Sequence, residues 1–161
     1  MKKRATLCLL CLLLAASAHA AARQPRRDIL GIRLNMSKNA AHNRLEKIGH
    51  LQREEKKRQE VWEVRDKYFS HVIVGFDEEW RVRFVTAVAH DSGRQRMRYS
   101  DVADLKRARQ EGDVKINNYH YVWELEARRR SPKTIVEARG RDPEYLSTYS
   151  IKKEGQPFED D

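Results

Sequence analysis

The sequence predicts an α+β fold made of two tandem halves, each a helix followed by three antiparallel strands, with the helices packed on one face of the sheet. Two observations support this prediction. Residues 71–89 alternate apolar and polar side chains on both sides of a polar turn, which is the pattern of a β-hairpin. The motif V-W-E-V at residues 61–64 recurs as V-W-E-L at residues 122–125, which indicates an internal repeat.

Residues 1–20 have the parts of a secretory signal peptide: a basic start, an apolar stretch and an end of small residues. Ala18 and Ala20 flank His19 in the A-x-A pattern, so we expect cleavage after Ala20. A leucine stands before Cys11 where a lipidated cysteine would need a small residue. Cys8 and Cys11 both lie in this signal, so the exported chain has no disulfide. We therefore predict an exported protein, periplasmic or secreted.

Signal removal also changes the charge of the chain. Loss of Lys2, Lys3 and Arg4 reduces the 33 basic residues to 30 against 24 acidic ones, a net charge of +6. A moderately basic surface favours anionic partners. We expect no nucleic-acid partner, because export separates the chain from nucleic acid and no recognised motif is present. No later apolar run is long enough to span a bilayer, so we expect no transmembrane segment after signal removal.

The first half covers residues 28–90, after a basic leader of residues 21–27 that we expect to be disordered. Ser37 is the expected N-cap of a three-turn helix, and Gly49 is its expected left-handed stop. The spacing of Ala41, Leu45 and Ile48 places them on one buried stripe of that helix. Residues 50–57 are a charged lead-in to a first strand that begins near residue 58.

Alternation predicts which side chains of the first sheet face the helix. Trp62 and Val64 face inward from the first strand, and Val72, Val74 and Phe76 from the second. In the third strand the inward set is Val82, Phe84, Thr86 and Val88.

The second half covers residues 91–152 and repeats the same order. Ser100 is the expected N-cap of a second helix that ends at Gly112, with Val102 and Leu105 on its apolar stripe. Strands follow at residues 119–128, 134–139 and 145–152, and residues 153–161 form a polar tail. The repeat predicts that Trp123 is buried at the place that matches Trp62.

Several motifs within residues 29–89 resemble a known superfamily. I-L-G-I-R-L-N-M-S, L-E-K-I-G, W-E-V and V-G-F-D-E-E-W-R-V are similar to motifs of the BamE/SmpA and β-lactamase-inhibitor-protein superfamily. The resemblance implies a small exported bacterial module of helices and antiparallel sheet that binds other proteins. Asn35 and Trp80 depart from the usual pattern, and the lipidation cysteine and the disulfides of some relatives are missing. It therefore implies fold and export rather than a particular partner.

No set of residues predicts catalysis. The histidines beyond the signal lack the spacing of metal ligands, and no nucleophile elbow or glycine-rich phosphate loop is present. They are His42, His50, His71, His90 and His120. We therefore expect no catalytic residue, no metal and no cofactor, with a small hydrolase of unrecognised site as the alternative.

Two kinds of surface are candidates for binding. The sheet face opposite the helices mixes charged and β-branched residues and is the predicted protein-binding face. Its charged residues are Glu63, Arg65, Arg81, Arg83, Glu124, Glu126, Glu137 and Arg139. Two basic loops predict contact with anionic lipid or lipopolysaccharide through Arg94, Arg96, Arg98, Arg128, Arg129 and Arg130. A solvated sheet face and solvated loops explain the same residues.

These observations predict a non-catalytic protein-binding module of the bacterial cell envelope, whose partner is an envelope or exported protein. An inhibitor or chaperone of an exported enzyme is the alternative.

Overall fold

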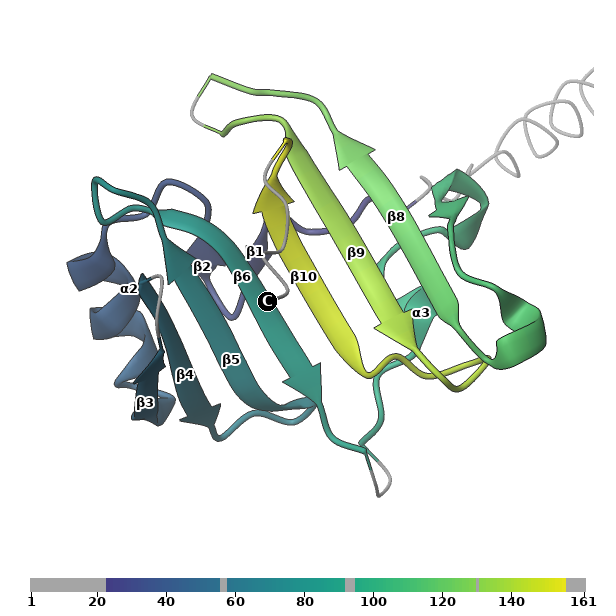
Figure 1. Cartoon of the computed structure of the whole chain (residues 1–161), viewed down its shortest axis with the longest axis horizontal. Helices are drawn as coiled ribbons and strands as arrows, with labels where there is room; N and C mark the ends of the chain where they lie inside the picture. The colour runs from purple at the N-terminus through teal and green to yellow at the C-terminus, as the bar shows by residue number, and fades with distance from the viewer. Residues whose placement is uncertain (1–22, 56–57, 92–94, 130, 156–161) are drawn as a thin grey trace, which may run out of the picture.

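The computed structural model describes residues 23–55, 58–91, 95–129 and 131–155. Figure 1 shows one broad sheet with the helices and a short ribbon behind it. The sheet has eight antiparallel strands in the order β3-β4-β5-β6-β10-β9-β8-β7, and the ribbon is β1-β2. The strands are β1 Asp28–Ile29, β2 Ile32–Arg33, β3 Gly49–Glu55, β4 Gln59–Val64, β5 Phe69–Phe76, β6 Val82–Ala89, β7 Arg109–Gln110, β8 Tyr119–Leu125, β9 Thr134–Gly140 and β10 Thr148–Lys153. The helical elements are α2 Lys38–Leu45, α3 Tyr99–Val102, η2 Leu105–Arg107 and η3 Val114–Ile116.

The predicted α+β fold of two helix-plus-three-strand halves is wrong. The described residues are mostly β, and each half contributes four strands to a single sheet. Within the described ranges α2 is the one helix that exceeds a single turn. The predicted signal peptide, with both cysteines, lies outside the described residues.

Strand β3 is the element that sequence alternation missed in the first half. Its residues after Gly49 are exposed on both faces, so the stretch predicted as a charged lead-in gives no apolar signal. It pairs with β4, with Gly49 opposite Val64. Gly49 is therefore a strand residue and not the left-handed stop of the helix. A Cβ at Gly49 would collide with the carbonyl oxygen of Glu63, so glycine permits the close approach of the two strands.

Helix α2 begins where the sequence predicts and ends earlier. Ser37 is its N-cap, and the Ser37 hydroxyl accepts a hydrogen bond from the Ala40 amide at 3.4 Å. Ala41 and Leu45 are fully buried, as the stripe predicts, and Ile48 is partly buried after the helix has ended.

The predicted second helix is reduced to the single turn of α3. Arg98, not Ser100, holds the N-cap position, and Ala103 returns to an extended conformation. The Asp104 carboxylate then accepts a hydrogen bond from the Lys106 amide at 3.0 Å, and Asp104 is the N-cap of η2. Aspartate side chains that bond nearby backbone amides compete with helix continuation, which explains the early end.

The predicted hairpin of β5 and β6 is present, but half of its facing pattern is wrong. Val72 and Val74 face the covered side, as predicted. A bulge between the Gly75 and Phe76 pairings then shifts the register of β6. Val85 and Ala87 therefore occupy the covered side, and Phe84 lies on the opposite face with Thr86 and Val88.

The strand order is symmetric about the β6–β10 pair, and the two V-W-E tryptophans occupy matching places in it. Trp62 in β4 pairs with Val72 of β5, and Trp123 in β8 pairs with Val136 of β9. Trp62 is 2% exposed and Trp123 is 3% exposed, so the predicted burial of both is confirmed.

Three elements cover one face of the sheet. The His42 ring of α2 stands edge-on to Trp62 at 5.2 Å, and Tyr99 of α3 contacts Tyr121 at 4.9 Å between ring centroids. The β1-β2 ribbon lies between them against β6 and β10. Pro25 is also buried, so part of the leader predicted to be disordered packs in an ordered position.

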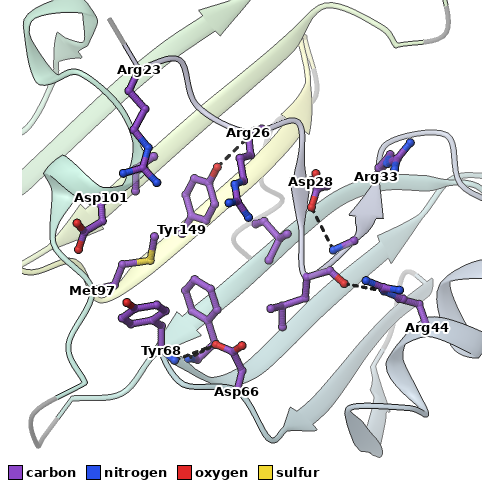
Figure 2. Close-up of a pocket in the computed structure, with 15 residues that line it drawn as sticks. Arg23, Arg26, Asp28, Arg33, Arg44, Asp66, Tyr68, Met97, Asp101 and Tyr149 are labelled. Atoms are coloured by element: carbon purple, nitrogen blue, oxygen red, sulfur yellow. Dashed lines mark hydrogen bonds between the residues drawn. The ribbon is translucent and has the colours of Figure 1, made fainter. Parts of the chain in front are cut away.

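This covering layer leaves a cavity of about 670 Å³ between the ribbon, α3 and β10. Figure 2 shows its charged lining, which includes Arg23, Arg26 and Asp101, and the ring of Tyr149 behind them.

Candidate functional site

The face of the sheet that points away from the helices is called the open face here. Within the described ranges no helix or strand lies over it, as Figure 1 shows. The strand registers and alternation place one row of side chains straight across it. That row is Val61, Ile73, Thr86, Ser150, Glu137 and Val122.

The eight predicted face residues occupy different places. Glu63, Glu124, Glu137 and Arg139 lie in strands on the open face. Arg83 lies at the bulge, with its guanidinium 5.4 Å from the Phe84 ring centroid. Arg65 and Glu126 follow the ends of β4 and β8. Arg81 lies in the β5–β6 turn, and its guanidinium donates to the Asn35 carbonyl at 3.4 Å.

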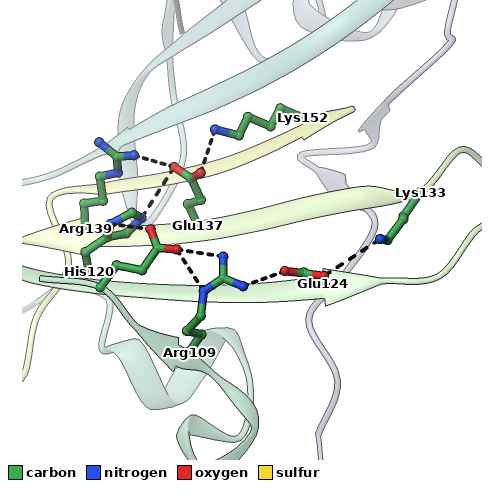
Figure 3. Close-up of polar contacts among 8 residues, drawn as sticks. Arg109, His120, Glu124, Lys133, Glu137, Arg139 and Lys152 are labelled. Atoms are coloured by element: carbon green, nitrogen blue, oxygen red, sulfur yellow. Dashed lines mark hydrogen bonds and ion pairs between the residues drawn. The ribbon is translucent and has the colours of Figure 1, made fainter. Parts of the chain in front are cut away.

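Glu137 is the centre of the charged part of the open face. Its side chain is only 6% exposed, and Lys152 and Arg139 contact its carboxylate at 2.7 and 2.8 Å. His120 lies 3.6 Å from the same carboxylate. Burial alone would raise the pKa of Glu137, but the neighbouring His120 ring, the hydrogen bond from Lys152 and the charge of Arg139 lower it to about 2. Figure 3 shows the side chains of Lys152, Arg139 and His120 converging on Glu137.

A second set of ion pairs surrounds this centre. Arg109 contacts Glu124 and Glu111, both at 2.7 Å, and Lys133 approaches Glu124 at 3.9 Å. Arg109, Glu111 and Glu124 are exposed, so these pairs contribute little to stability. They keep charged groups in fixed positions at the rim.

Sequence reasoning missed several members of this charged set. His120, Arg109 and Lys152 were not in the predicted face. The alternation that assigns Glu124 to the open face assigns His120 there as well, so that signal was available. The contact of Arg109 depends on the two-residue strand β7, which has no sequence pattern of its own.

The other half of the open face carries an apolar patch on β5 and β6. Ile73 lies diagonal to Phe84 and Val88 on the neighbouring strand, and all three are partly exposed. The Phe84 ring lies directly over Gly75. A Cβ added at this glycine would overlap the ring, so only glycine leaves room for it. The face is thus divided into an apolar part on β5 and β6 and a charged part on β8, β9 and β10.

The two parts occupy equivalent places in the symmetric sheet. Val88 pairs with His71, and Lys152 pairs with Ile135 in the other half. Ile73 and Glu137 likewise flank Thr86 and Ser150 in the central row. One half therefore places Ile73 and Val88 where the other places Glu137 and Lys152.

Two arginines of the basic loops, Arg96 and Arg98, make local side-chain contacts. Arg96 contacts Asp142 at 3.0 Å, and Arg98 contacts Glu144 at 3.2 Å; both lie near the Tyr145 ring. The Arg128 backbone closes a turn with Ser131, and Arg129 is exposed. Arg94 and Arg130 lie outside the described residues.

Two further features, a metal site and a membrane-spanning helix, concern the residues that the structure describes. No group of three or more metal-ligating side chains is present among these residues. Every helix in the same ranges is too short or too polar to traverse a lipid bilayer.

The chain matches no family model, no curated protein and no solved structure.

Proposed function

We propose that the chain is an exported, non-catalytic protein-binding module of the bacterial cell envelope, and that its partner binds the open face. The partner is an envelope or exported protein whose surface presents an apolar patch beside a charged one. Export rests on the sequence of residues 1–20, and the resemblance to the BamE/SmpA superfamily stays a prediction.

One observation carries the proposal: Ile73 and Val88 are apolar and partly exposed on the face of the sheet that no described helix or strand covers. Partly exposed apolar groups beside ordered charges are typical of a binding surface, where the apolar centre supplies affinity and the charges supply orientation. A face that is merely solvated has no need of this patch, since the equivalent places of the other half carry Glu137 and Lys152.

A protein partner is favoured over an anionic lipid surface. Arg96 and Arg98, which the sequence suggested for lipid contact, are held by Asp142, Glu144 and Tyr145. Their charge is thus largely compensated within the chain.

The test is capture of partners from an envelope extract of the source cell by the parent protein and by Val88→Lys. Val88 is partly exposed, so a lysine ammonium at this position can reach solvent in the free protein. Val114→Lys is the matched control, because Val114 is 46% exposed in η3, away from the open face. Melting temperatures of all three proteins report whether folding is intact.

We expect a protein that the parent and the control capture equally and that Val88→Lys captures at least about tenfold less, because the lysine ammonium would be desolvated in the contact. Equal capture by a folded Val88→Lys would overturn the proposal. Ile73→Thr is a milder second variant that should lose the same partner. A captured enzyme whose turnover falls on binding would favour the inhibitor alternative.

A further inference from the structure

The cavity on the covered face is separate from the open face and lies where the two halves meet. Its walls come from the β1-β2 ribbon, the turn before β5, α3 and β10. Its volume of about 670 Å³ is within the range of small-molecule sites, which is about 300 to 1,000 Å³.

Four arginine side chains contribute to the lining of this cavity. The guanidinium groups of Arg23 and Arg26 extend into the same space in Figure 2. Neither side chain makes a hydrogen bond or an ion pair within the ranges that the structure describes. Arg33 and Arg44 also line the cavity, and Arg44 donates to the Leu30 carbonyl at 3.2 Å.

The acidic residues of the lining are engaged with backbone amides. Asp28 accepts the Gly31 amide at 3.1 Å, and Asp66 accepts the Tyr68 and Phe69 amides at 2.8 and 3.1 Å. Asp101 accepts the Arg98 amide at 3.1 Å. These carboxylates hold turns in place through backbone amides, whereas the guanidinium groups of Arg23 and Arg26 have no such local contact among the described residues.

The opposite wall is apolar or aromatic. Met97 and Tyr68 lie across the space from Arg26 in Figure 2, and Phe69 and Val102 also belong to the lining. The Tyr149 hydroxyl donates to the Arg26 carbonyl at 3.4 Å, and Tyr149 is also part of the lining. A site with two guanidinium groups that no described residue pairs, and with an apolar wall, suits a ligand with one anionic end and one apolar end.

We propose that this cavity binds a small amphipathic anion, with a carboxylate or phosphate at Arg23 and Arg26 and an apolar body against Met97 and Tyr68. This activity goes beyond the partner binding assigned to the open face, and it does not depend on it. Bidentate contacts between guanidinium groups and the anion would supply the selectivity for charge.

The probes are decanoate and decyl phosphate, with 1-decanol as the uncharged counterpart, titrated below the concentrations at which they aggregate. Calorimetry measures affinity, and the methyl signals of ¹³C-methionine locate the ligand. Met97 lines the cavity, whereas Met36 does not, so Met36 is an internal control.

Arg23→Gln/Arg26→Gln removes the two proposed anchors. Arg129→Gln/Arg141→Gln is the matched control, because it removes the same charge from two exposed positions away from the cavity. We expect decanoate or decyl phosphate to bind the parent and the control alike and to shift the Met97 signal. We expect affinity for the double cavity variant to fall about tenfold or more, as loss of charge-assisted hydrogen bonds predicts.

Comparison of the two anions shows whether the head group is a carboxylate or a phosphate. The proposal is overturned if neither anion binds, if 1-decanol binds as tightly as the anions, or if the cavity variant binds as the control does. It is also overturned if Met36 shifts and Met97 does not. None of these results bears on capture at the open face, which Val88→Lys tests separately.

Discussion

Thr86 and Ser150 share a hydrogen bond of 2.9 Å between their hydroxyl oxygens at the centre of the sheet. They are also paired residues of β6 and β10, the strands at which the two halves join. Both are buried, and they separate Ile73 from Glu137 in the row across the open face. A single polar contact therefore lies at the boundary between the apolar and the charged parts.

The first prediction is that this hydroxyl pair is energetically coupled. Thr86→Val and Ser150→Ala should each destabilise the protein by about 1 to 2 kcal/mol, because each leaves a buried hydroxyl without its partner. The double variant should be less destabilised than the sum by about 1 kcal/mol. Chemical denaturation of the four proteins measures the coupling, and strictly additive losses would mean that the contact contributes nothing.

The second prediction concerns Gly75 and the Phe84 ring above it. Gly75→Ala should destabilise the parent, because the new methyl group overlaps the ring. In a Phe84→Ala background the same change should cost much less, since the obstacle is gone. Gly75 has no positive φ to complicate the comparison. An equal loss in both backgrounds would place Phe84 elsewhere than on the open face.

The third prediction is that both V-W-E tryptophans are core residues. Trp62→Ala and Trp123→Ala should each destabilise by about 3 to 5 kcal/mol, as large-to-small changes in cores do. Each indole also donates a hydrogen bond, Trp62 to Glu60 and Trp123 to the Asp104 carbonyl, both at 3.1 Å. Arg83→Ala is the comparison and should cost far less. A mild effect of Trp123→Ala in thermal melts would contradict its burial.

Sequence reasoning could locate elements with a strong apolar period and could not locate those without one. Alternation gave β5, β8 and β9, and the Ser37 cap gave the start of α2. Strand β3 has almost no apolar residues, and its pairing with β4 depends on tertiary contact rather than local propensity. The short α3 was predicted too long because its capping signals did not reveal the competing turn at Asp104.

Prediction of the candidate site from the sequence also depended on the regularity of each strand. Glu137 and Arg139 were assigned to the correct face because β9 is regular. Phe84 was assigned to the wrong face because a bulge reverses the alternation. No pattern in the sequence predicted this bulge. The cavity arginines come from the leader, α2 and β2, so only the folded chain brings them together.

The fourth prediction is that the exported protein begins at Ala21. The small-residue pattern that ends at Ala20 defines the cleavage site of the proposed signal peptide. Intact-mass measurement on protein recovered from the envelope fraction checks this directly. A retained Met1, or an added diacylglycerol mass, would contradict both export by cleavage and the absence of lipidation.

The last prediction is a pH dependence of stability that originates at Glu137. The pKa of this carboxyl is about 2 in the folded chain, against an ordinary value of 4.5. Because the folded pKa is the lower one, the folded state favours the carboxylate, and the stabilisation is complete above the ordinary pKa and is lost as pH falls from about 5 to about 2. The size of this stabilisation is on the order of 2 kcal/mol.

Glu137→Gln should therefore be less stable than the parent at pH 7, and the difference in stability should shrink towards pH 2. Glu124→Gln, at an exposed carboxylate of the same face, should show little of this effect. Denaturant unfolding across this pH range measures the difference, and a gap between parent and Glu137→Gln that stays constant with pH would show that His120, Lys152 and Arg139 do not hold the carboxylate in its ionised form.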